Sequence, residues 1–60
     1  MKQYNVTFEI FRGSNHKAYE TVGVEAGTKK LALMRAMGII NKLKDYKDLY
    51  KNVIRVEEKE

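Results

Sequence analysis

Apolar and polar residues alternate over the first twelve positions of the chain. The apolar side chains between Lys2 and Arg12 fall at every second position: Tyr4, Val6, Phe8 and Ile10. A period of two places them on one face of a strand and the intervening polar residues on the other. The pattern therefore predicts a half-buried strand with one face in water. Phe11 falls on the water-facing side and departs from the alternation.

A second alternating stretch follows a short turn. The Gly-Ser-Asn sequence at 13–15 suits a tight hairpin, because Gly and Asn tolerate positive φ. The second strand is predicted from about His16 to Ala26, with Val22 and Val24 facing inward. Tyr19 has the opposite parity. It lies either on the water-facing side or next to a β-bulge that shifts the alternation, and the lack of an extra glycine favours the first interpretation.

The periodicity changes to 3.6 residues from Thr28 to about Tyr46. At 100° per residue, one side of a helix gathers Ala32, Ala36, Ile39, Ile40 and Leu43, with Leu33 and Tyr46 beside them. This predicts an amphipathic helix that covers a sheet. Thr28 suits the N-cap, because its hydroxyl can accept from a backbone N–H of the first turn. No glycine marks the end, which we expect between Lys44 and Tyr50.

A final alternating stretch predicts a third strand from Val53 to Glu57. Ile54 and Val56 would face the helix, and Leu49 or Tyr50 would close the end of the core. The element order is then β-β-α-β, an α+β fold. A right-handed crossover through the helix makes the third strand parallel to the second and places it beside the first. We therefore expect a three-stranded antiparallel sheet in the order 2-1-3, with the helix packed on one face.

The outward side of the predicted helix is unusually apolar. Leu31 and Met34 point away from the inward cluster, Gly38 lies with them, and Met37 and Asn41 border the stripe. Contiguous exposed apolar residues mark contact surfaces, Gly permits close backbone approach, and Met adapts to irregular partners. These five residues are the candidate partner-binding site. The alternative is a scatter of exposed apolar side chains, which is common on protein surfaces.

Length and composition limit the classes of protein. We expect one small domain over residues 1–60, which is marginally stable by itself and gains from oligomerisation. There is no cysteine, hence no disulfide and no Cys-based metal site, which fits a cytoplasmic protein. We see no signal peptide and no apolar run near the ~20 residues that span a bilayer, and we expect no membrane partner.

The formal charge of +4 is concentrated in the helix and the loop after it. From Thr28 to Asn52, seven basic residues stand against Asp45 and Asp48. Nucleic-acid binding is therefore the alternative function. It would use the basic flank of the helix: Lys29, Lys30, Arg35, Lys42 and Lys44.

Catalysis and metal binding are poorly supported. The chain holds one His and one Ser, and His16 and Ser14 lie in or beside the predicted turn. Nucleophilic catalysis needs a nucleophile, a base and an orienting acid that meet in space. His16 has only Glu20 nearby, and no spacing resembles a structural zinc site. We expect no enzyme, no catalytic residue, no metal, no cofactor and no small-molecule substrate.

The Thr28-Lys29-Lys30 turn between a hairpin and a helix resembles the arm-binding domains at the start of phage integrases. Those domains place three strands before the helix, whereas this chain puts its third strand after the helix, and we assign no family. Lysine-rich chains of this size without cysteine are also similar to accessory proteins of phages and mobile elements. The leading hypothesis is a non-enzymatic accessory protein that binds a protein partner or itself, as a homodimer.

Overall fold

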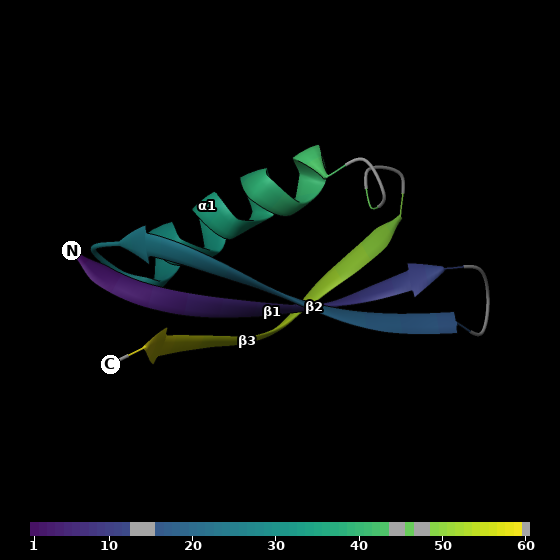
Figure 1. Cartoon of the computed structure of the whole chain (residues 1–60), viewed down its shortest axis with the longest axis horizontal. Helices are drawn as coiled ribbons and strands as arrows, with labels where there is room; N and C mark the ends of the chain where they lie inside the picture. Colours follow the sequence, from purple (N-terminus) through teal and green to yellow (C-terminus); the bar gives the residue numbers. More distant parts are fainter. Residues whose placement is uncertain (13–15, 44–45, 47–48, 60) are drawn as a thin grey trace.

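The computed structural model describes residues 1–12, 16–43, 46 and 49–59. Three strands and one helix follow one another in the order β1 (Lys2–Arg12), β2 (His16–Ala26), α1 (Lys29–Lys42) and β3 (Tyr50–Lys59). Figure 1 shows the long β1–β2 hairpin twisting about itself, with both chain ends at the same end of the molecule. The turn predicted at 13–15 lies outside the described residues.

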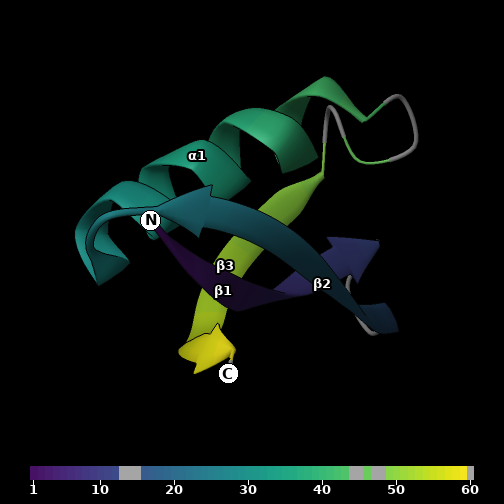
Figure 2. The same ribbon diagram turned by 60° about the vertical axis from the view of Figure 1, so that its left-hand side comes forward.

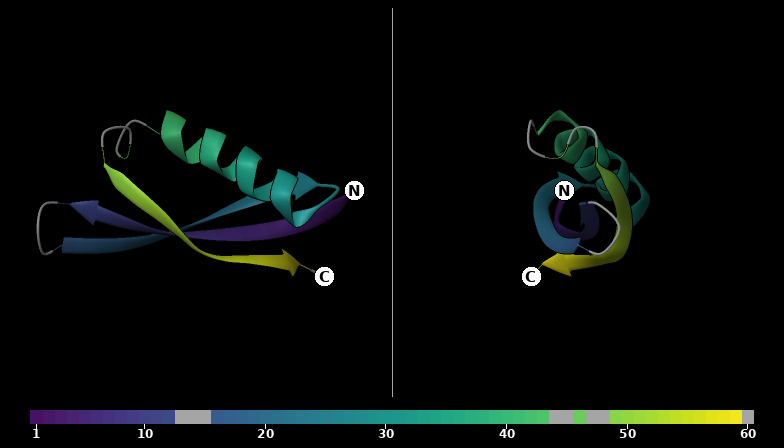
Figure 3. Two further views of the ribbon diagram at one scale, coloured as in Figure 1. Left: turned by 180° about the vertical axis from the view of Figure 1, so that it is seen from behind. Right: turned by 90° about the vertical axis from the view of Figure 1, so that its right-hand side faces the viewer.

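The strands form one antiparallel sheet in the order β2-β1-β3. The helix lies on one face of it, as the end-on view in Figure 3 shows. The predicted α+β architecture is therefore confirmed. A crossover through α1 returns the chain on the free side of β1, which is the only place where β3 can pair antiparallel with β1.

The core lies between the helix and this face of the sheet. Its buried side chains come from every second position of β1 and β2 and from one line along α1: Tyr4, Val6, Phe8, Ile10, Val22, Val24, Ala26, Ala32, Ala36 and Ile40. Tyr19 pairs with Glu9 without a register shift and is exposed, which settles its position on the face away from the helix. Among the described residues, no polar or charged side chain is buried.

The helix begins and ends with local hydrogen bonds. Thr28 is the N-cap, and its hydroxyl accepts from the Leu31 N–H at 3.2 Å. At the other end, the Leu43 N–H donates to the Ile40 carbonyl, 3.2 Å away, and Leu43 is extended. Such a tight last turn satisfies a carbonyl as the helix stops.

Two expectations for this helix were wrong. It ends at Lys42 rather than between Lys44 and Tyr50. Ile39 and Leu43 are half-exposed rather than part of the inward cluster. Ile39 lies beside the buried line through Ala32, Ala36 and Ile40. Leu43 follows the last helical residue with an extended backbone, so it leaves that line.

A β-bulge in β3 overturns the predicted orientation of its first half. Thr7 pairs with Arg55 but Phe8 pairs with Val53, so Ile54 is the extra residue. An added residue reverses the alternation on one side of it. Ile54 is consequently 48% exposed instead of facing the helix, whereas Val53 pairs with Phe8 and is 38% exposed.

The rest of β3 agrees with the sequence only in part. Val56 packs against the core, as predicted, and Leu49 rather than Tyr50 closes its end. The strand runs from Tyr50 to Lys59, longer at both ends than the predicted five residues. Pairing with the full length of β1 accounts for the added length.

Candidate interaction surfaces

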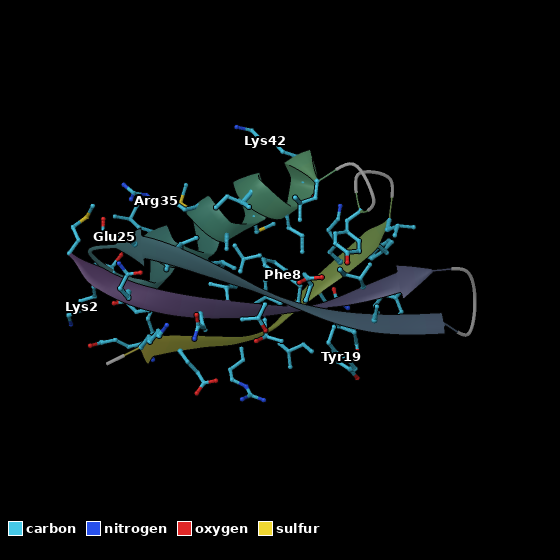
Figure 4. All side chains as sticks on the ribbon, in the orientation of Figure 1. Lys2, Phe8, Tyr19, Glu25, Arg35 and Lys42 are labelled. Carbon is cyan, nitrogen blue, oxygen red and sulfur yellow. The ribbon has the colours of Figure 1, made fainter. Side chains whose placement is uncertain are left out.

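The helix sits off-centre on the sheet. It packs mainly against β2, as the turned view in Figure 2 shows. The Arg35 guanidinium donates to the Glu25 carbonyl at the outer edge of β2, with an N–O distance of 2.6 Å, and Figure 4 shows these two residues side by side. Because this hydrogen bond holds α1 toward β2, space remains on the other flank of the helix, toward β3.

That space is a groove of about 290 Å³ between α1 and β3, here called the α1–β3 groove. Its lining is mostly apolar and comprises Phe8, Met37, Ile40, Asn41, Leu49, Tyr50, Lys51 and Val53. Phe8 is almost fully buried and lies below the helix (Figure 4). The Lys51 ammonium donates to the Asn41 side-chain oxygen at 2.9 Å, which links the helix to the strand. A groove of this kind can accept a large apolar side chain.

The outward side of α1 forms a second apolar surface, the outer ridge, made by Leu31, Met34 and Gly38. Leu31 is 44% exposed and Met34 is 60% exposed. A Cβ placed on Gly38 would meet no atom within 4 Å, so the helix backbone is open to a neighbour there. Met34 and Met37 are three residues apart and therefore adjacent on the helix surface, which makes the outer ridge continuous with the α1–β3 groove.

The five residues predicted from sequence thus divide between two surfaces. Leu31, Met34 and Gly38 form the outer ridge, whereas Met37 and Asn41 belong to the groove. The sequence did not identify the groove's other wall. Tyr50 had been placed in a connection and Val53 on the opposite face, because the bulge at Ile54 leaves no glycine or other signal in the sequence.

The described basic residues of α1 lie at both ends of the helix and in its middle rather than in one separate patch. Lys29, Lys30 and Lys42 are exposed, and none makes an ion pair with another described residue. Figure 4 shows Lys42 pointing away from the sheet. Arg35 is held toward β2 by its hydrogen bond, and Lys44 lies outside the described residues.

The face of the sheet away from the helix carries polar side chains that bond to one another, together with the exposed Tyr19 and Ile54. It carries an open hollow of about 870 Å³ lined by Thr7, Glu9, Tyr19, Asn52, Val53, Ile54 and Arg55. The Thr7 and Thr21 hydroxyls are 3.1 Å apart, and the Tyr19 hydroxyl donates to Glu9 at 3.4 Å. Arg55 pairs with Glu57 at 3.0 Å. These polar groups have partners within the sheet, so they do not require a ligand.

Metal-ligating side chains are scattered in the part of the chain that the structure describes. It holds no group of three or more His, Cys, Asp or Glu side chains that could bind a metal ion. In the same residues, no helix combines the length and the apolar character that crossing a membrane requires. The chain matches no family model, no curated protein and no solved structure.

Proposed function

We propose that this protein is a non-enzymatic binding module that acts by contact with a protein partner through the outer ridge and the α1–β3 groove. The observation that carries the proposal is the exposure of Met34, at 60%, directly beside an open apolar groove. Interfaces are anchored by large apolar side chains in desolvated pockets and are enriched in Met. Exposed apolar surface of this continuity is typical of a contact site.

The small core supports the same proposal. The helix contributes only Ala32, Ala36 and Ile40 to the buried set, and alanine brings little apolar area. A chain of 60 residues buries only about 60% of the surface that its unfolded form exposes. A partner on the outside of α1 would add burial where the chain itself supplies least.

Partner recovery from a host lysate tests the proposal. Immobilised wild type is compared with Met34→Lys and Met37→Lys, each with nuclease present. The matched control is Ile54→Lys, which places the same charge on an exposed apolar residue of the opposite face. We expect a protein that wild type and the control retain and that both Met variants lose. Retention by all four proteins would contradict the proposal.

A second copy of the chain could also occupy this surface. A homodimer would be isologous, with α1 packed on α1 about a two-fold axis. Sedimentation distinguishes it: a dimer should dissociate when Met34 becomes Lys, and a wild type that stays monomeric at high concentration contradicts self-association.

Nucleic-acid binding is the second candidate function. The observation that favours it is that Lys29, Lys30 and Lys42 are exposed and make no ion pair with another described residue. Binding through them must weaken steeply with salt, because each phosphate contact releases counterions. The test is a mobility shift with DNA or RNA at low and high salt. No shift at low salt would rule this function out.

A further inference from the structure

We infer that the partner of the outer ridge and the α1–β3 groove is an acidic amphipathic segment of another protein. The inference rests on the proposed function and specifies the chemistry of the partner. It follows from the juxtaposition of an apolar surface with a helix whose charged residues are all basic.

All charged residues of α1 are basic. The helix sequence KKLALMRAMGIINK contains Lys29, Lys30, Arg35 and Lys42 and no Asp or Glu. Surface helices commonly carry both signs, because opposite charges three or four residues apart stabilise each other. Here the first turn has no acid, although an acid there would be favoured by the helix dipole. The helix therefore presents positive charge to a partner without an acid of its own.

The cations lie at both ends of the apolar surface. Lys29 and Lys30 precede Leu31 at the start of the outer ridge, and Lys42 follows Gly38 by one turn at its other end. Lys51 stands in the groove wall, beside Asn41. The helix of 14 residues is about 21 Å long, which matches a short amphipathic partner helix laid along it. Such a partner would bury its apolar side chains centrally and pair its carboxylates at the ends.

A second copy of this chain fits the charge pattern badly. Packing α1 on α1 brings together two surfaces that carry four basic residues each and no acid. Like charges placed opposite each other across an interface disfavour the complex. Charge complementarity therefore selects a different molecule.

Other acidic partners match only part of the surface. A nucleic acid would meet the lysines with phosphates but would leave Met34 and Met37 without apolar contacts. An anionic membrane would need a broad apolar face on the helix. The exposed large apolar side chains of α1 are Leu31, Met34, Met37 and Ile39. Arg35 and Gly38 interrupt them, so they do not form one broad apolar face. An acidic protein segment satisfies both the apolar groove and the cations.

Selection from a random peptide display library tests the inference without assuming a sequence. The full-length protein is immobilised, and peptides are kept if wild type binds them and Met37→Lys does not. We expect these peptides to combine apolar residues with an excess of Asp and Glu. Remaking one with Asn and Gln should weaken its binding about tenfold or more.

Charge reversal on the protein supplies the matched control. Lys30→Glu should weaken the same peptide by a similar factor, whereas Lys59→Glu should not. Lys59 pairs with Gln3 at the far end of β3. Lys59→Glu therefore makes the same change of charge at a position outside α1 and the groove. Selected peptides without acidic excess, or equal effects of the two variants, would overturn the inference and leave the proposed function standing. Failure to select any peptide that depends on Met37 would overturn both.

Discussion

Gly38 is unfavourable for the helix but favourable for the proposed site. It lies inside α1, where glycine is less favourable than alanine because its unfolded backbone has more freedom. Nothing within 4 Å would obstruct a Cβ there, so the folded monomer does not require glycine. A partner backbone that approaches the outer ridge closely would require it.

Gly38→Ala should therefore stabilise the isolated protein, by about 0.5–1 kcal/mol. The physical reason is the lower backbone entropy of the unfolded chain with no new steric contact in the folded one. Urea denaturation followed by circular dichroism measures the change. A loss of stability would show that the helix surface is not open at this position.

The bulge in β3 sets the orientation of its side chains. It turns Ile54 to the open face and leaves Val56 against the core. Replacing Ile54 with Thr should change the free energy of unfolding by no more than about 0.5 kcal/mol. Val56→Thr should cost about 1 kcal/mol or more, because it puts a hydroxyl into a partly buried apolar site. Chemical denaturation measures the free energy of unfolding of both variants. A larger loss of stability for Ile54→Thr than for Val56→Thr would mean that β3 follows the unbulged register.

The order and pairing of the elements could be predicted because each rests on a strong periodic signal. The alternation in β1 fixes which of its side chains are buried, and Thr28 fixes the start of α1. The end of α1 could not be predicted, because it depends on where Leu43 leaves the helix to let the chain turn toward β3. The orientations of Val53 and Ile54 could not be predicted for a similar reason. The bulge arises from pairing with β1, which is a tertiary effect without a local sequence signature.

The candidate site was predicted only as far as it lies on the helix. Leu31 and Met34 are exposed as the periodicity of 3.6 requires. The α1–β3 groove depends on the sideways position of α1, which the Arg35–Glu25 hydrogen bond helps to set. Residues 25 and 35 come from separate elements, and no pattern within either element predicts that contact. Tyr50, exposed at 77%, gains its place in the site only from that geometry.

At the scale of the whole molecule, the two faces differ in whether their side chains find partners within the protein. On the sheet face away from the helix, Thr7, Glu9 and Tyr19 hydrogen-bond to neighbouring strands. On the helix side, Met34 and Met37 remain exposed beside an apolar groove, and Lys29, Lys30 and Lys42 make no ion pair with another described residue. We therefore propose that the helix side makes the contact with a protein partner.

Site-specific photocrosslinking in a host lysate tests that assignment most directly. A photoreactive amino acid replaces Met34 or Met37 in two variants and Thr21, on the open face of the sheet, in a third. The account predicts that the same protein partner is crosslinked from positions 34 and 37 and not from position 21. Crosslinking from position 21 alone, or from none of the three, would contradict it.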